Sequence, residues 1–219
     1  AKLNNDIISG LTALSEAPAS TDELLVSDGG TIKRVDFSLL ASTPHKTLLH
    51  TVTASDTASV VFNNTYITST YRDYHITFSN VHSANNSVGF NLNFSTDNGS
   101  SYVSSDVHMM TFGRSANTTS AQNNITSNSS GGKIELTGNQ SHGNATGETT
   151  SGEITLYDFL GTNNHKSLQG VLTGENSDGN GILIVIGGQV RTTTAINAVK
   201  LSFASGNIAS GVFKIYGIT

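Results

Sequence analysis

Residues 88–95 read Val88-Gly89-Phe90-Asn91-Leu92-Asn93-Phe94-Ser95, with an apolar side chain at every second position. Successive side chains of a β-strand point to opposite faces of its sheet, so the four apolar residues share one face. Asp97-Asn98-Gly99 follows closely, and these residue types favour a tight turn. The stretch therefore predicts a half-buried strand that ends in a turn, as in an antiparallel sheet.

The same alternation recurs in residues 74–79, 153–157 and 199–203. Residues 182–186 are apolar without interruption, which predicts a central strand covered on both faces. Several strands separated by turns, without a convincing helix, predict an all-β fold: an antiparallel, jelly-roll-like β-sandwich over residues 45–219. The alternating stretches predict these core residues: Tyr74, Ile76, Phe78, Val88, Phe90, Leu92, Phe94, Ile154, Leu156, Val199, Leu201 and Phe203.

The composition narrows the classes of function. Only 12% of the 219 residues are charged and the net charge is −5, so the chain lacks the basic runs that bind nucleic acid. It has no Cys, which excludes disulfides, thiolate metal sites and cysteine nucleophiles. Its longest apolar run, residues 182–186, is too short to span a bilayer, so we expect no membrane insertion.

Residues 1–44 form a separate N-terminal arm in this interpretation. Leu3, Ile7, Leu11 and Leu14 have helical spacing, although Gly10 weakens a helix there. Residues 24–35 place β-prone runs on both sides of Asp28-Gly29-Gly30, which predicts a β-hairpin. An isolated hairpin is marginally stable in water, so the arm should need a partner surface.

Residues 114–152 are dominated by Asn, Ser, Thr and Gly, apart from Lys133-Ile134-Glu135-Leu136-Thr137. We interpret them as two long loops around one short strand. Loops of this kind carry ligand contacts or are simply solvated surface. The residues predicted to contact a ligand are Asn117, Asn123, Asn124, Asn139 and His142.

A search for catalytic patterns finds little. None of the 7 His forms an H-E-x-x-H pair, and Ser141-His142 lacks a G-x-S-x-G elbow. A polysaccharide hydrolase needs two facing carboxylates, and no spacing pairs the available ones: Glu135, Glu153, Asp158, Glu175 and Asp178. We therefore expect no enzyme activity, no cofactor and no metal.

Four stretches resemble virion-associated β-sandwich proteins of tailed bacteriophages, notably tail fibres of marine phages. They are residues 11–18 with 21–36, the run Tyr71-Arg72-Asp73-Tyr74 with 76–81, residues 94–102, and residues 203–217. Their order, and coverage of most of the chain except the 114–150 loops, carry the resemblance. It implies a structural component of the virion, assembled in the bacterial cytoplasm as a homotrimer and contacting tail, baseplate or capsid proteins.

This resemblance favours a short tail fibre or surface appendage that contributes to binding a host receptor glycan. A capsid decoration or head-fibre protein is the alternative, and a free carbohydrate-binding module is a third. In the first two cases residues 1–44 dock onto the particle. The residues predicted for that docking are Leu11, Leu14, Leu24 and Ile32.

Overall fold

The computed structural model describes residues 15–16, 18–19, 21–37, 45–116 and 121–219, with the backbone alone for residues 121–130. The chain divides into two compact units, Ala1–Pro44 and His45–Thr219. Strands that pair antiparallel make up the regular structure of both units, which confirms the all-β prediction. The jelly-roll part of that prediction remains a prediction. The helix considered for residues 3–14 lies outside the described residues.

The first unit contains the predicted hairpin. β1 (Glu23–Asp28) pairs with β2 (Thr31–Asp36), and Asp28 lies opposite Thr31 at the turn. Gly29 and Gly30 have φ of 57° and 83°, a region that glycine enters without strain. Every residue of the two strands is exposed or half-buried, so the hairpin has no core of its own.

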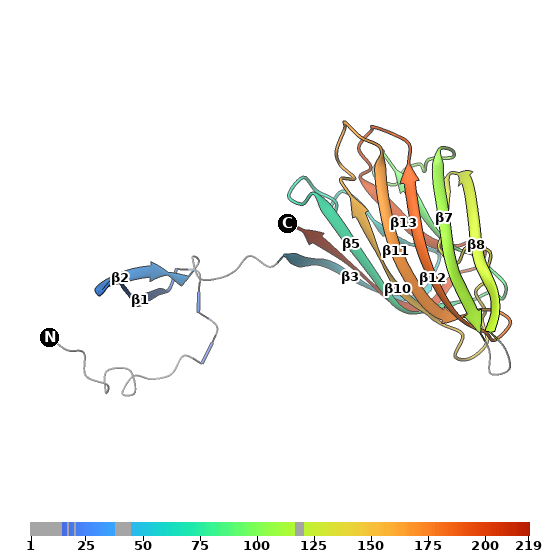
Figure 1. The fold of residues 1–219 in the computed structure, drawn as a ribbon, viewed down its shortest axis with the longest axis horizontal. Coiled ribbons are helices and arrows are strands. Elements are labelled where there is room, and N and C mark those ends of the chain that lie inside the picture. The colour runs from blue at the N-terminus through green and yellow to red at the C-terminus, as the bar shows by residue number, and fades with distance from the viewer. Residues whose placement is uncertain (1–14, 17, 20, 38–44, 117–120) are drawn as a thin grey trace. The chain divides into compact units, whose positions relative to one another are not determined.

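The second unit contains an eight-stranded sheet, called here the larger sheet, with the order β3-β14-β5-β10-β11-β12-β7-β8 (Figure 1). Its strands are β3 (Lys46–Thr57), β14 (Ile208–Ile218), β5 (Asp73–Ser83), β10 (Thr150–Tyr157), β11 (Lys166–Glu175), β12 (Gly181–Val190), β7 (Val107–Ala116) and β8 (Ala121–Gly131). Consecutive strands β10, β11 and β12 form an antiparallel meander in its middle.

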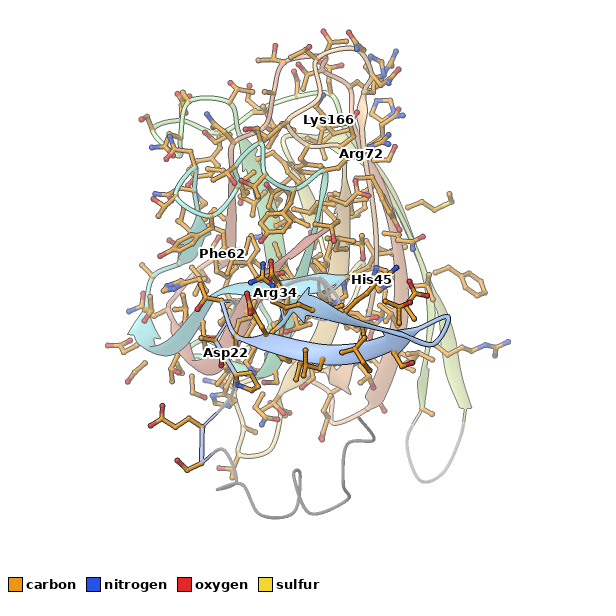
Figure 2. All side chains as sticks on the ribbon, turned by 90° about the vertical axis from the view of Figure 1, so that its left-hand side faces the viewer. Asp22, Arg34, His45, Phe62, Arg72 and Lys166 are labelled. Carbon is orange, nitrogen blue, oxygen red and sulfur yellow. The ribbon has the colours of Figure 1, made fainter. Side chains whose placement is uncertain are left out.

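A smaller sheet packs against one face of the larger sheet. Its four strands have the order β4 (Val60–Phe62), β13 (Ala198–Phe203), β6 (Phe90–Ser95) and β9 (Lys133–Glu135). Phe90 on β6 meets Phe78 and Phe213 of the larger sheet at ring-centroid distances of 5.4 and 6.5 Å. Phe62 on β4 is fully buried (Figure 2). All of the core residues predicted from alternation are buried, which confirms that prediction.

The interpretation of residues 114–152 as two loops around one strand is wrong for their first part. The backbone of β8 pairs with β7 from Val107↔Gly131 to Ala116↔Ala121. An edge strand pairs through backbone groups, so an Asn/Ser/Thr-rich sequence can form one without an apolar alternation. The short strand expected near Lys133 is present as β9.

The prediction that residues 182–186 are covered on both faces is also wrong. They lie in β12, an interior strand between β11 and β7, yet only Ile182, Ile184 and Ile186 are buried. Leu183 and Val185 point to the face turned away from the smaller sheet and are each 53% exposed. Among the described residues no helix has the length and apolar character needed to cross a membrane.

Candidate ligand-binding face

The face of the larger sheet that is turned away from the smaller sheet is called here the outer face. Strand register on β10, β11, β12 and β7 sets outward-pointing residues in three rows across this face. The rows are Ser151–Thr173–Leu183–Arg114, Glu153–Val171–Val185–Phe112, and Thr155–Gln169–Gly187–Met110. Polar side chains lie mainly at the β10 end of the rows, and apolar ones at the β12 and β7 end.

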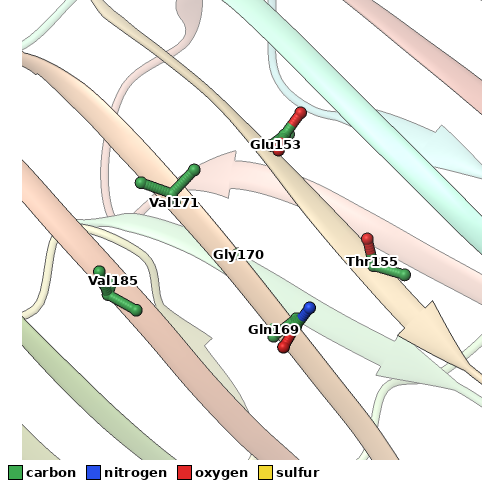
Figure 3. A pocket seen from close by; sticks show the side chains of 6 residues that line it. All are labelled: Glu153, Thr155, Gln169, Gly170, Val171 and Val185. Atoms are coloured by element: carbon green, nitrogen blue, oxygen red, sulfur yellow. The ribbon is translucent and has the colours of Figure 1, made fainter.

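A shallow hollow of about 280 Å³ lies between the second and third rows. Figure 3 shows Glu153 and Thr155 on β10, Gln169 and Val171 on β11 with Gly170 between them, and Val185 on β12. Gly170 pairs with the buried Ile154, and a Cβ at Gly170 would point to the interior, 3.1 Å from Cγ1 of Ile154, so the side chains of the other five residues form the lining. The hollow therefore has hydrogen-bonding groups on one side and two branched apolar groups on the other.

Two further hollows continue along the outer face. One of about 350 Å³ shares Glu153 and Val171 with the first and extends to Thr173 and Leu183. The other, of about 430 Å³, opens above Gly187 and has an almost wholly apolar wall that includes Met110. The three hollows turn this part of the sheet into a grooved surface.

A histidine fixes the polar end of the outer face. His75 on β5 is buried beside β10, with Nδ1 3.1 Å from the Thr155 hydroxyl and Nε2 3.3 Å from the Glu153 carboxylate. Burial lowers the pKa of His75, with Lys46 acting in the same direction and Glu153 opposing both. The ring is therefore neutral at pH 7, and its contact with Glu153 is not an ion pair at that pH.

An aromatic residue of β14 completes this end. The Tyr216 ring stands edge-on to His75 at 6.2 Å between centroids, and the Lys46 ammonium lies 4.4 Å from the Tyr216 centroid. A cation over an aromatic face is attracted by the ring quadrupole. These contacts hold His75 in place, and its hydrogen bond at Nδ1 holds the Thr155 hydroxyl with it.

The opposite end of the outer face is apolar and open. Met110, Phe112, Leu183 and Val185 are 68%, 59%, 53% and 53% exposed. Val185 lies directly between Val171 and Phe112 in one row, so the exposed side chains form a continuous patch rather than isolated positions. Contiguous apolar patches on a soluble protein mark sites of interaction.

The chemistry available here is that of binding. Of the side chains that line the three hollows, all within the described part of the chain, only Glu153 carries a carboxylate. No three His, Cys, Asp or Glu residues come together as a metal site would need, as far as the structure describes the chain. Hydrogen-bonding groups beside apolar ones suit a ligand with hydroxyl groups and C–H faces, such as a sugar.

The residues predicted to contact a ligand do not converge on this face. Asn123 and Asn124 lie on the edge strand β8, where the register shifts by one residue, and Asn117 lies outside the described residues. Asn139 is exposed in the turn after β9. His142 is 1% exposed, with both ring nitrogens at backbone carbonyls, so it packs this loop from inside and offers no surface to a ligand.

Of the residues predicted for docking, Leu11 and Leu14 lie outside the described residues. Leu24 and Ile32 are both exposed on the hairpin. Leu24 lies opposite Val35, whereas Ile32 lies opposite Ser27, so the two side chains point to different faces. Each face of the hairpin therefore offers an apolar contact.

The sequence argument missed the residues of the outer face. Gln169 and Val171 lie in a glycine-rich strand that alternation did not identify, and Val185 was assigned to the interior. The positions that alternate along the chain with the buried Ile154, Leu156 and Ile184 could have suggested outward-facing residues. Only the strand order shows which of those residues are neighbours. Comparison of the chain with protein-family models, curated proteins and solved structures gives no match.

Proposed function

We propose that this chain is an attachment protein of a tailed-phage particle, in which the hairpin unit docks onto the particle and the outer face binds a glycan of the host surface. The phage assignment rests on the sequence resemblance. Glycan binding rests on one observation: the row-aligned hollow that joins Glu153, Thr155 and Gln169 to Val171 and Val185. Docking is supported by a hairpin that exposes apolar side chains on both faces.

A binding role fits the geometry better than a catalytic one. Hydrolysis of a glycosidic bond uses a pair of carboxylates flanking the bond, and Glu153 is alone among the described lining residues. A shallow hollow gives weak affinity for a single site. Many copies on one particle would raise the overall affinity, because later binding events become intramolecular.

A capsid decoration protein is the second candidate. A protein that clamps neighbouring subunits must contact two surfaces, and this chain has two separate apolar surfaces: the hairpin, with Leu25 and Ile32, and the patch around Phe112. The number of copies on purified particles distinguishes a capsid decoration protein from a fibre. Many tens to hundreds of copies favour decoration, and a small multiple of three favours a fibre.

Glycan binding is tested with the full chain on immobilised lipopolysaccharide O-chains and capsular polysaccharides of bacterial hosts. Gln169→Ala should weaken binding to the recognised glycan about tenfold because it removes a hydrogen-bonding amide, and Glu153→Gln should have a similar effect because it replaces a charge-assisted acceptor by a neutral one. Thr53→Ala, on the exposed part of β3, serves as the matched control and should bind like the wild type. Equal binding by the wild type and all three variants would show that the glycan site lies elsewhere on the chain. A chain that binds none of the glycans would contradict the proposed glycan-binding role.

A further inference from the structure

The side of the smaller sheet that is turned away from the larger sheet has two lysines in one row. The strand register sets four residues in line across β4, β13, β6 and β9: Val61, Lys200, Asn93 and Lys133. Leu92, which precedes Asn93 on β6, is fully buried and points inward, so the row points outward. Three half-buried members, called here the lysine row, place an amide between two ammonium groups: Lys200, Asn93 and Lys133.

An aromatic ring holds one end of the lysine row. The Lys200 ammonium lies 4.1 Å from the centroid of the Tyr102 ring, where the ring quadrupole attracts it. Burial raises the pKa of Tyr102, and Asp97 acts in the same direction, so the phenol is neutral at pH 7. The ring therefore positions the ammonium without neutralising its charge.

The carboxylate that follows Lys133 on β9 is turned away from the row. Glu135 lies on the same face of β9 as Lys133, but its carboxylate occupies the space beside Gly89, where an added Cβ would clash with it. Lys133 pairs with Asn93, and Glu135 pairs with Asn91. Because Gly89 precedes Asn91 on the chain, it lies on the far side of Glu135 from Lys133.

Asp97 is held by its own turn. Its Oδ1 accepts hydrogen bonds from the Ser95 hydroxyl at 2.7 Å and from the Ser101 backbone N–H at 2.8 Å, and its Oδ2 accepts one from the Ser101 hydroxyl at 2.6 Å. Among the described residues, no carboxylate lies within 4.0 Å of either ammonium of the lysine row. The row therefore carries two cations without an acidic partner, on a chain whose net charge is −5.

We propose that the lysine row binds an acidic polysaccharide, with negatively charged groups at Lys133 and Lys200 and a hydroxyl group at the Asn93 amide. β13 and β9 are two strand spacings apart, so the backbones of the two lysines are about 10 Å from each other. This separation suits a polymer whose charges are spaced by uncharged sugar atoms. Duplex DNA carries about one charge every 1.7 Å and would be repelled by the negatively charged chain, so nucleic acid fits this row less well.

This site is separate from the hollow that contains Glu153. The hollow lies on the larger sheet, whereas the lysine row lies on the smaller one. The Glu153 carboxylate repels an anionic sugar, and the lysine row attracts one, so the two surfaces select different ligands. The proposal therefore does not depend on glycan binding at the hollow.

The test is binding of the full chain to immobilised polygalacturonate, a polymer of acidic sugars, beside uncharged dextran and duplex DNA. The wild type should bind polygalacturonate but not dextran, and less tightly as the salt concentration rises, because the charges are partly exposed. Lys133→Gln and Lys200→Gln should each weaken this binding about threefold to tenfold. Lys214→Gln removes the same charge from a half-buried position on β14, and it should bind like the wild type.

Asn93→Asp gives a sharper result with almost no change in size. It places a carboxylate between the two ammonium groups, so binding to polygalacturonate should be lost, whereas Glu153→Gln should leave it intact. Circular dichroism and urea unfolding show whether the variants fold. The proposal would be overturned by an equal loss in Lys214→Gln, which would mean a general charge effect, by no binding to polygalacturonate, or by tighter binding to duplex DNA.

Discussion

The buried imidazole of His142 lies with Nε2 3.0 Å from the backbone carbonyl oxygen of Val81 on β5. Its other nitrogen, Nδ1, lies 2.7 Å from the carbonyl oxygen of Gly143, and its ring meets Phe203 edge-on at 5.0 Å. A neutral imidazole has one N–H, so it can donate to only one of the two carbonyls. Burial lowers the pKa of His142, and it outweighs the two carbonyls and Glu148, which favour the charged ring, while His82 acts with burial.

This arrangement predicts that the protein loses stability in mild acid. The folded-state pKa of His142 lies below its unfolded value of about 6.5, so the unfolded chain takes up the proton first as the pH falls. The stabilising contribution is complete above the unfolded pKa and is lost as the pH falls through the folded pKa. Each unit between the two values corresponds to about 1.4 kcal/mol. Buried His75, whose pKa is lowered too, adds to the same slope.

Urea unfolding at several pH values between 7.5 and 5 measures this slope. His142→Gln keeps one hydrogen-bond donor but does not titrate, so it should lower stability at pH 7.5 and flatten the slope. His165→Gln changes an exposed histidine and should keep the wild-type slope. A slope that His142→Gln leaves unchanged would mean that His142 does not control the acid response.

A second prediction concerns Lys166, whose side chain is buried at the start of β11 (Figure 2). Its ammonium donates to the carbonyl oxygens of Gly161 and Asn164, the latter at 2.9 Å, and so closes the loop before the strand. Burial lowers the pKa of this amine, with Asp158 opposing. Lys166→Met keeps the apolar stem but removes both hydrogen bonds.

Lys166→Met should cost about 1–3 kcal/mol, because two carbonyls lose their donor while the rest of the side chain still packs. Urea unfolding at pH 7 gives the value, with Lys214→Met on the half-buried outer face of β14 as control. Hydrogen exchange in residues 159–165 should also speed up. A stability equal to the wild type would show that desolvation of the amine already cancels its hydrogen bonds.

Alternation predicted the interior of the sandwich well, because a residue such as Leu92 or Ile154 is buried by local periodicity whichever strands lie beside it. The hairpin could be predicted equally well, because Gly29 and Gly30 adopt the positive φ that its turn requires. The outer face could not be predicted from the sequence. Whether Val185 faces a second layer or solvent depends on which elements cover β12. Strand β8 forms through backbone pairing, and its sequence has no apolar alternation from which the strand could be predicted. The candidate site needs both facts.

The third prediction uses two adjacent glycines on β12. A Cβ on Gly188 would lie 2.1 Å from Cδ1 of Ile134 and 3.2 Å from Leu168, both of which are buried between the sheets. Gly187 points outward into open space. Neither glycine has a positive φ, so alanine meets no backbone strain at either position and the comparison isolates packing.

Gly188→Ala should therefore destabilise the protein by about 1–3 kcal/mol through overpacking, while Gly187→Ala stays within about 0.5 kcal/mol of the wild type. Ile134→Val removes the atom that clashes and alone costs about 0.5–1.5 kcal/mol. Because the two changes then relieve one another, the double variant Gly188→Ala/Ile134→Val should lose less than the sum of the single losses in urea unfolding. Additive losses would place the two residues out of contact, and they would contradict the packing of β9 against β12 on which the sandwich interior depends.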